Sequence, residues 1–400
     1  MFALFVINKL LAIYSGPTGI AIIGQFQNII QISNGLSQGG VNYGITKYTA
    51  EYKDNFEKVI SLWSTGLKVT LFCSSIMSIL LIFFSEIISK YFFESSEYSY
   101  LFIFFGVSIS FFALNQFLLS ILNGLKEIKT LTVINIIQSI YFLCFVSFLI
   151  IYFEIHGALV GLVTSQSLVF IIALFLLRNH FKIKLKNFIS KFDKQIFLKL
   201  LKYSGMAIIS LIFVPSSFLI IRLYIGETLD WDKAGLWQAI ILISNSYLLL
   251  IGTALNTYYL PRLSEINEVR ELKKELYDGY KFIIPLTISL CFFIFFLKEE
   301  ILLVLFSEQF KSAEILFKWQ LIGDFIKVCA FLFSYIMLAK ALTKTYIFTE
   351  IIFSISFVLL SIIFINYHGI LGTTYAYALN SFLYFLVIFY LIKKQIFSYN

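Results

Sequence analysis

The sequence predicts an all-α integral membrane protein with twelve transmembrane helices, arranged as two parallel six-helix lobes around a central cavity. Three observations predict this fold: an unusually apolar composition, a series of long apolar runs, and an internal repeat. Apolar residues make up 59% of the 400 residues and charged residues only 14%, whereas a soluble domain has about 45–50% and about 25%. A globule this apolar would have too few polar groups to cover its surface, which excludes a water-soluble fold.

The apolar runs define the expected helices, because a membrane-spanning helix needs about 20 mainly apolar residues. The runs are 1–14, 17–46, 59–89, 98–123, 130–153, 157–178, 203–225, 234–260, 279–298, 316–339, 345–366 and 369–392. Polar or turn-forming residues separate them. The first run of about 14 residues reaches only about 21 Å as a helix, so we expect helix 1 to be shortened or continuous with helix 2. Continuous apolar runs also exclude the alternating strands of a transmembrane β-barrel.

Lysine and arginine are concentrated in alternate loops. One set of loops holds 22 of the 31 basic residues and the other set holds six. Because basic loops stay on the cytoplasmic side, we expect both termini and the basic segment 179–202 in the cytoplasm. This segment is the predicted linker between an N-terminal lobe, 1–178, and a C-terminal lobe, 203–400. Topology and contact with anionic lipid explain the net charge of +8, so no nucleic-acid partner is expected.

The two predicted lobes carry related sequence patterns. The matching segments are 24–35 with 235–246 at an offset of 211, 156–159 with 368–371 at 212, and 129–130 with 344–345 at 215. One match is weak evidence in an Ile-rich chain, but three matches in the same order indicate duplication of a six-helix unit. Six is even, so the copies have the same orientation. In transporters built this way, substrate binds between the halves while one half rocks against the other.

Few charged side chains fall inside the predicted spans, and most of them are cations. A charge at the centre of the bilayer costs about 2.5–3.5 kcal/mol on insertion scales, so each is a candidate functional residue. The candidates are Lys9, Lys68, Arg222, Asp324, Lys327 and Glu350, with Lys47 and Lys340 near cytoplasmic helix ends. Alternatives stay open for several of them. Lys9 and Lys68 can snorkel to the interface, and Arg222 can anchor the outer interface.

Asp324 and Lys327 are spaced at i and i+3, so they share one helix face. They form either a self-neutralising ion pair or a cavity-lining pair that opens when an anionic ligand or another ion competes for Lys327. Glu350 is either a proton or sodium site or a partner of Lys340 or Lys344.

Amide side chains form a second candidate set, suited to binding sugars. Gln27, Gln31 and Asn34 recur at i, i+4 and i+7, which places them on one helix face. The corresponding predicted helix of the second lobe offers Trp237, Gln238, Asn245 and Asn256. Such a stripe faces a cavity or a neighbouring helix, because lipid would leave the amides without hydrogen bonds. The alternative role is interhelical hydrogen bonding that holds the bundle together.

Catalysis and metal binding find no support in the sequence. Cys73, Cys144, Cys291 and Cys329 lie in apolar runs without a CxxC spacing or a histidine neighbour, as is typical of small core residues. His156, His180 and His368 have no Ser or Cys nucleophile arrangement around them. A P-loop is also missing, so we expect a protein that is not an enzyme and has no cofactor.

Several motifs together resemble one family of membrane proteins. They are Gly16-Pro17-Thr18-Gly19 with Gly24-Gln25-Phe26, the run GVNYGITKYTAEY at 40–52, Trp231-Asp232 with 235–238, Leu260-Pro261-Arg262-Leu263, residues 319–324 with Lys327, and Ala339-Lys340-Ala341. Over nearly its whole length the chain resembles the Wzx-type polysaccharide flippases, in the O-antigen and enterobacterial-common-antigen lipid branch of the multidrug/oligosaccharidyl-lipid/polysaccharide exporter superfamily. The sequence departs from the family at its front, where helix 1 starts late.

The resemblance implies twelve helices around a V-shaped cavity in the bacterial inner membrane. It implies a cargo of undecaprenyl-diphosphate-linked oligosaccharide, moved from the cytoplasmic to the outer leaflet. For that cargo we expect Lys9, Arg222 and Lys327 to bind the diphosphate and the amide set to line the glycan path. Asp324 and Glu350 are the candidates for ion coupling.

The expected partners are that cargo, membrane lipid, a coupling ion (proton or sodium) and a polysaccharide polymerase complex. An ion-coupled multidrug antiporter of the same superfamily is the alternative function. It would have acidic rather than basic residues in its cavity.

Overall fold

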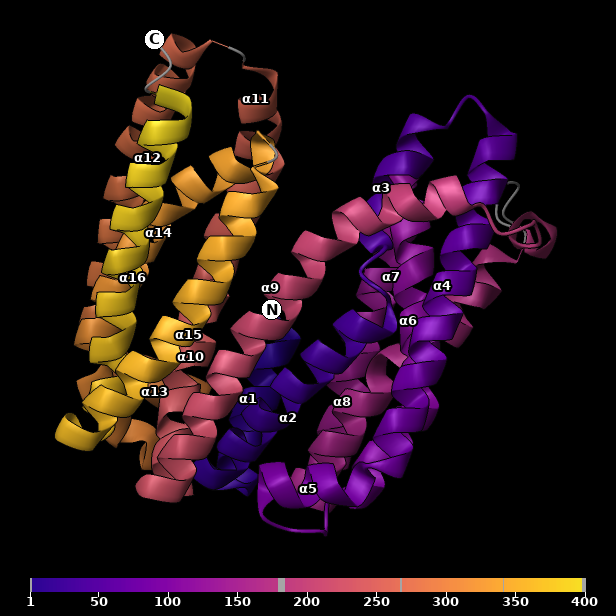
Figure 1. Ribbon diagram of the computed structural model, residues 1–400. Helices are drawn as coiled ribbons and strands as arrows, with labels where there is room; N and C mark the ends of the chain where they lie inside the picture. Colours follow the sequence, from indigo (N-terminus) through magenta and orange to yellow (C-terminus); the bar gives the residue numbers. More distant parts are fainter. Residues whose placement is uncertain (1, 179–183, 267, 341, 398–400) are drawn as a thin grey trace. The chain divides into compact units, whose positions relative to one another are not determined.

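The computed structural model describes residues 2–178, 184–266, 268–340 and 342–397, and within these ranges the chain is helical with no β-strand (Figure 1). It divides into two compact units. The N-terminal unit comprises Phe2–Tyr14 and Ile22–Pro215, and the C-terminal unit comprises Ser15–Ala21 and the described residues of Ser216–Asn400. The boundary between the units falls inside two helices, α2 and α9. The predicted six-helix lobes, 1–178 and 203–400, stay a prediction.

The helices from the start of the chain to α9 belong mainly to the N-terminal unit. They are α1 (Phe2–Tyr14), α2 (Gly16–Ser37), α3 (Asn42–Glu51), α4 (Phe56–Phe83), α5 (Ser85–Phe93), α6 (Ser99–Gly124), α7 (Ile128–Tyr141), the π-helix η1 (Phe142–Val146), α8 (Ser147–Leu177), the 3₁₀-helix η2 (Leu185–Phe188) and α9 (Lys194–Thr228). Within this unit α6 packs against α4 on one side and α8 on the other. Helix α9 begins at Lys194, earlier than the predicted 203, so the end of the predicted linker is helical.

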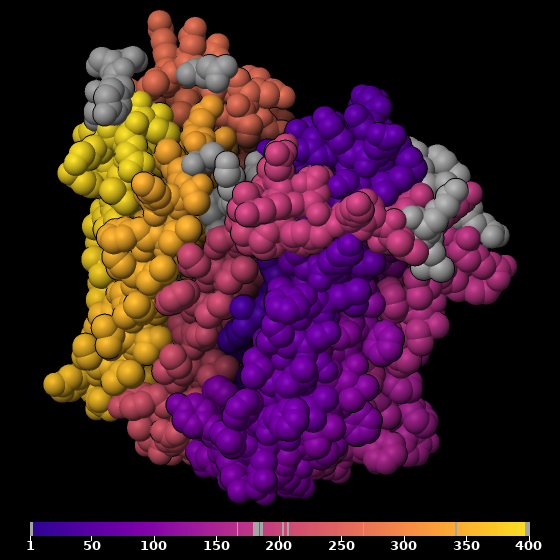
Figure 2. Space-filling model, turned by 45° about the vertical axis from the view of Figure 1, so that its right-hand side comes forward, coloured from indigo at the N-terminus to yellow at the C-terminus, as the bar shows by residue number. Residues whose placement is uncertain are grey.

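The predicted run 17–46 divides into α2 and α3 at a pair of glycines. Gly39 and Gly40 have φ values of +60° and +64°, which an L side chain rarely adopts. A Cβ atom on Gly40 would also lie 2.8 Å from Cγ1 of Ile208 on α9. The glycines therefore permit both the break in the helix and the close approach of α9. Figure 2 shows the first part of α9, in pink, lying against the purple side chains of the same unit.

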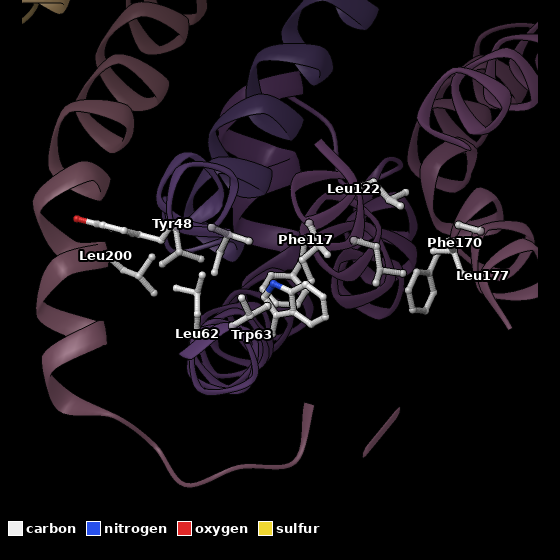
Figure 3. Close-up of a cluster of buried hydrophobic side chains, with 14 of the residues drawn as sticks. Tyr48, Leu62, Trp63, Phe117, Leu122, Phe170, Leu177 and Leu200 are labelled. Carbon is white, nitrogen blue, oxygen red and sulfur yellow. The ribbon is translucent and has the colours of Figure 1, made fainter. Parts of the chain in front are cut away.

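The core of the N-terminal unit is centred on Trp63 of α4. The Trp63 indole is fully buried, stacks on Phe188 with ring centroids 5.7 Å apart, and donates a hydrogen bond from Nε1 to Oγ1 of Thr49 at 3.0 Å. Figure 3 shows Trp63 beside Phe117 in the middle of this cluster, with Tyr48 at its edge. Since Thr49 lies on α3 and Phe188 on η2, this one side chain holds three elements together.

Each unit contains a tight helical reversal built in the same way. The backbone turns at Glu154 with a φ of +49° and at Gly369 with a φ of +58°. A few residues later the helices touch. A Cβ atom on Gly157 would lie 2.0 Å from the Leu149 carbonyl oxygen, and one on Gly372 would lie 2.2 Å from the backbone of Phe364. Both pairs of equivalent positions are 215 residues apart. The sequence match of 156–159 with 368–371 at an offset of 212 is therefore three residues out of register here.

The remaining helices form the C-terminal unit. They are α10 (Trp231–Ala254), the π-helix η3 (Leu255–Tyr259), α11 (Leu260–Glu265), α12 (Val269–Phe296), α13 (Lys298–Leu305), the 3₁₀-helix η4 (Glu308–Leu316), α14 (Phe317–Ala339), α15 (Thr343–His368), α16 (Leu371–Ile392) and the π-helix η5 (Lys393–Phe397). Helix α14 packs against α16, α12 and α10. The beginning of α2 also belongs to this unit. Thr18 donates a hydrogen bond to Asp232 at 2.6 Å, and a Cβ atom on Gly235 would lie 1.8 Å from the Pro17 carbonyl oxygen.

In the described residues, nine helical segments are long and apolar enough to cross a membrane. The difference from the predicted twelve has physical causes. The segment Ile128–Leu177 counts once but contains the reversal at Glu154. Helix α1 is too short, and the amide groups of α2 lower its hydropathy. The count of twelve spans stays a prediction.

Candidate functional site

A fully buried carboxylate, Asp324 on α14, forms the centre of a polar cluster in the C-terminal unit. Its oxygens accept hydrogen bonds from three hydroxyl groups: Ser244 at 2.6 Å, Tyr377 at 2.7 Å, and Tyr247. The side-chain amide of Gln320 lies 3.4 Å from the carboxylate. Burial of a charged group is costly unless it is hydrogen-bonded, and here the donors come from α10, α14 and α16.

A glycine makes this convergence possible. Gln320 and Asp324 are one helical turn apart on α14, and Ser244 and Tyr247 share a face of α10. Between them Gly323 leaves space for the ring of Tyr377, because a Cβ atom there would lie 2.5 Å from Cδ1 of that ring. Any larger residue at position 323 would displace the tyrosine from the carboxylate.

Lys327 lies beside this cluster but is not the ion-pair partner of Asp324. In the described part of the chain no salt bridge joins the two residues, and the ammonium group instead lies 5.4 Å from the centroid of the Tyr377 ring. The charge of Lys327 interacts at longer range with that of Asp324 and also with that of Glu350 on α15, whose carboxylate is hydrogen-bonded to Tyr384. The hydroxyl groups thus satisfy Asp324, and the half-buried cation is held by an aromatic face.

Arg222 on α9 is 1% exposed and lies deep in the same unit. It donates a hydrogen bond to the side-chain oxygen of Gln238 on α10, and its guanidinium carbon lies 5.7 Å from the centroid of the Trp237 ring. Tyr224, two residues further along α9, donates its own hydrogen bond to Asn366 at 2.6 Å. Three of the predicted site residues, Arg222, Trp237 and Gln238, therefore come together.

A series of aromatic rings connects the two cations. Trp237 stacks on Phe218 at 5.8 Å, Phe218 contacts Phe357 at 5.6 Å, and Phe357 contacts Tyr377 at 5.8 Å between ring centroids. The cationic groups of Arg222 and Lys327 lie over the two rings that end the series. Because such contacts favour positive charge over a ring face, both cations are held in place without a neutralising salt bridge to Asp324.

The other predicted residues are not gathered into this cluster. Lys9, Gln27, Gln31 and Asn34 belong to the N-terminal unit, where Gln31 is exposed and Asn34 is buried with its side-chain oxygen lacking a hydrogen bond. In the C-terminal unit, Asn245 and Asn256 are exposed. Lys340 donates to the backbone carbonyl oxygen of Ile266. His180 lies outside the described residues.

Sequence reasoning missed four members of the cluster: Ser244, Tyr247, Gln320 and Tyr377. Ser244 is part of the repeated segment 235–246, and Gln320 lies in the motif 319–324. These two patterns could have identified both residues as candidates. The tyrosines had none, since the chain contains 24 of them.

Comparison with known proteins places these observations in context. The family model described as polysaccharide biosynthesis protein matches residues 1–267. The chain is 29% identical over 384 residues to the lipid III flippase of Escherichia coli (strain K12), covering 95% of this chain and 91% of that protein. These relatives are transporters rather than enzymes.

Two solved structures share the fold. A multidrug resistance MATE family transporter of the MOP superfamily has a TM-score of 0.86 at 13% identity, covering 100% of this chain and 95% of the other. The lipid II flippase MurJ has a TM-score of 0.76 at 19% identity, covering 98% and 85%. At these identities the likeness shows the fold alone, which is that of a multi-pass membrane transporter.

Proposed function

Because the chain belongs to the polysaccharide biosynthesis protein family, we propose that it is a flippase for undecaprenyl-diphosphate-linked oligosaccharide. It moves an O-antigen-type repeat unit from the cytoplasmic to the periplasmic leaflet of the bacterial inner membrane, by alternating access between two six-helix lobes. The E. coli relative that matches 95% of the chain is named a lipid III flippase, which supports this choice of cargo.

The observation that carries the proposal is that the Lys327 ammonium group lies over the Tyr377 ring and, among the described residues, forms no salt bridge with Asp324. Its neighbour Asp324 receives its hydrogen bonds from Ser244, Tyr247 and Tyr377, so the carboxylate does not cancel the lysine charge through a salt bridge. A half-buried ammonium group over an aromatic ring is suited to a phosphate oxygen. Arg222 supplies a planar guanidinium suited to bidentate contact with a phosphate group. Lys9 of the N-terminal unit is the third proposed diphosphate ligand.

Asp324 and Glu350 are the proposed sites for a coupling ion, either a proton or sodium. A carboxylate surrounded by hydroxyl groups offers oxygen atoms to either cation. The amides Gln27, Gln31 and Asn34 of α2, with Trp237, Gln238, Asn245 and Asn256 of α10 and η3, are the proposed contacts for the glycan. A polysaccharide polymerase complex is the proposed recipient of the flipped product.

The alternative function is an ion-coupled multidrug antiporter, favoured by the shared MATE fold. A cationic drug would need acidic groups along its path. The buried array of the C-terminal unit instead places Arg222 and Lys327 over aromatic rings, encloses Asp324 in hydroxyl groups, and sets the charge of Glu350 against that of Lys327. This distribution of charge suits an anionic cargo better.

A clean deletion in a strain without a paralogue tests the proposal. Lipid-linked oligosaccharide should accumulate on the cytoplasmic leaflet and surface glycan should be lost. Complementation with Arg222→Ala or Lys327→Ala should fail at normal protein abundance, whereas Arg222→Lys should restore part of the glycan. Lys318→Ala, an exposed lysine on the same helix as Lys327, is the matched control and should complement fully. Normal surface glycan in the deletion strain would contradict the proposed function.

A further inference from the structure

Three exposed lysines converge on a pair of stacked tyrosines in the N-terminal unit. Tyr48 lies on α3 and Tyr52 caps the C-terminal end of that helix. Their ring centroids are 5.6 Å apart and the ring planes are inclined by 23°. The ammonium group of Lys47 lies 5.4 Å from the Tyr48 ring and that of Lys58 lies 5.9 Å from the Tyr52 ring. Lys199 reaches both rings, at 5.9 and 5.5 Å, and donates a hydrogen bond to the Tyr52 hydroxyl oxygen at 2.9 Å. These five residues are called the lysine–tyrosine cluster below.

The fold builds the lysine–tyrosine cluster from three separate elements, α3, α4 and α9. Gly44 lets α9 approach α3 closely, because a Cβ atom on it would lie 2.6 Å from Cδ2 of Leu200. The neighbouring residue on α9, Lys199, is thereby brought over the tyrosines. Figure 3 shows Tyr48 and Leu200 together at the edge of the apolar core, with the Tyr48 hydroxyl oxygen directed away from Trp63.

The loop that precedes α9 is tied to α4 by three hydrogen bonds, one of which runs from the Ser61 hydroxyl to the Asp193 carboxylate at 3.4 Å. The ammonium group of Lys68 donates to the Ser190 carbonyl oxygen at 2.6 Å, and the Asp193 backbone N–H donates to Oγ1 of Thr65 at 3.1 Å. Lys68 was a candidate functional residue within a predicted span, and in the structure its ammonium group donates to the backbone of this loop. The position of Lys199 is therefore set by the packing around it.

The lysine–tyrosine cluster concentrates three ammonium groups around two rings, with the Glu51 carboxylate near enough to interact with Lys199. Among the described residues, neither Lys58 nor Lys199 forms a salt bridge with a carboxylate. The hydrogen bond that Lys199 donates to the Tyr52 hydroxyl oxygen raises the pKa of Lys199, so that group stays charged at neutral pH. Each ring contact at an exposed site contributes about 0.5–1 kcal/mol. Three ammonium groups around two rings also repel one another, and an anion between them would relieve that repulsion.

The location of the lysine–tyrosine cluster points to an anion carried by a lipid. Lys58 lies in the first turn of α4, which is an apolar helix long enough to span a membrane. Residues at the start of such a helix lie at the depth of the lipid headgroups. A glycerophospholipid phosphate carries a single negative charge, whereas a diphosphate diester carries two. Three cations match the diphosphate more closely.

We propose that the lysine–tyrosine cluster is a docking site for the diphosphate of the lipid-linked oligosaccharide at the membrane surface, before the headgroup enters the transport path. This inference rests on the proposed function and adds a binding step to it. The lysines hold the diphosphate, and the stacked rings hold the lysines in place.

Binding of undecaprenyl diphosphate to the purified full chain in nanodiscs of zwitterionic lipid tests the proposal, with native mass spectrometry as the readout. The triple variant Lys47→Gln, Lys58→Gln, Lys199→Gln should weaken binding about a hundredfold, and Lys58→Gln alone about fivefold, the effects typical of lysines near a charged membrane surface. The triple Lys→Arg variant keeps the charge and should bind like the wild type. Lys58→Gln removes only an exposed ring contact, so it keeps the test valid if the triple Gln variant fails to fold.

The matched control removes three other exposed lysines of the same unit, through Lys129→Gln, Lys191→Gln and Lys194→Gln, and should bind undecaprenyl diphosphate like the wild type. Phosphatidylglycerol is the second probe. Equal weakening in the control, equal weakening for both lipids, or unchanged binding in the Gln variants would each overturn the docking site and leave the proposed function standing. A wild-type protein that binds no undecaprenyl diphosphate, together with normal surface glycan in the deletion strain, would overturn both.

Discussion

At the scale of single residues, the chemistry of α14 depends on which groups satisfy Asp324. The i, i+3 spacing suggested that Lys327 is its partner, and in the structure the partners are hydroxyl groups on α10 and α16. Spacing along one helix is visible in a sequence. The approach of Tyr247 and Tyr377 from other helices is a tertiary contact, for which the sequence carries no signal. The sequence thus identified the two charged residues but not the bonds between them and their neighbours.

We expect Lys327→Ala to abolish surface glycan while leaving thermal stability near that of the wild type, because the hydroxyl groups still satisfy Asp324. Asp324→Leu should instead lower the free energy of unfolding by about 1–3 kcal/mol, since it leaves buried hydroxyl donors without an acceptor. Thermal unfolding of the purified variants in detergent measures both effects. The double variant Asp324→Asn, Lys327→Ala should remain inactive at normal abundance. Recovery of glycan in that double variant would remove Lys327 from the diphosphate site.

Gly323→Ala should be destabilising although the change is small, because the new methyl group would lie 2.5 Å from the Tyr377 ring. We expect a loss of about 1–3 kcal/mol, as for other overpacked cores, measured by thermal unfolding. Gly252→Ala in the same unit is the control, since nothing lies within 4 Å of a Cβ atom there. An unfolding temperature equal for the two variants would contradict this packing of Tyr377.

At the scale of elements, the sequence located most helices and placed the break near residues 156 and 368 correctly. It aligned the repeats there through the histidines, at an offset of 212. The structure aligns the reversals through Glu154 and Gly369, at 215. The two turns correspond in backbone conformation, with a positive φ at Glu154 and at Gly369. The sequence does not show this correspondence, because only one of the two turns has a glycine. For the same reason the division of 17–46 at Gly39 and Gly40 was visible only as a possible bend.

The two reversals predict opposite effects of exchanging their turn residues. Glu154→Gly should stabilise the protein by about 1–3 kcal/mol, because it removes a side chain from a backbone conformation that glycine alone adopts freely. Gly369→Glu should destabilise it by a similar amount. Thermal unfolding of both variants gives the sign of each effect. A lower unfolding temperature for Glu154→Gly would show that the turn is not strained.

At the scale of the whole molecule, composition and apolar runs were sufficient to predict an all-helical, multi-pass membrane protein. Composition and apolar runs did not establish the number of membrane spans. Helix α1 is short, α2 is rich in amides, and the continuous segment Ile128–Leu177 contains the reversal at Glu154. The two compact units also differ from the predicted lobes in that neither unit is one continuous stretch of the chain. Residues 15–21 pack with the C-terminal unit. The apolar runs alone do not indicate this contact, because they show only the order of the helices along the chain.

The distribution of basic residues makes a prediction about the whole topology. With both termini in the cytoplasm, a cysteine introduced through Lys186→Cys, in a background lacking the four native cysteines, should resist an impermeant maleimide added to intact spheroplasts. The same cysteine should react once the membrane is permeabilised, which is the control for its accessibility. Ready labelling from outside would reverse the proposed orientation.

The placement of residues 15–21 has a consequence for biogenesis. This segment leaves the ribosome well before its partners, since Thr18 bonds to Asp232 and Pro17 packs on Gly235. At about 5–20 residues per second, those partners emerge on the order of 10–40 s later. Until then residues 15–21 lack their packing partners, and the insertion machinery must keep them accessible. A gene cut between the two units would therefore yield a second fragment that lacks residues 15–21, which pack with the C-terminal unit.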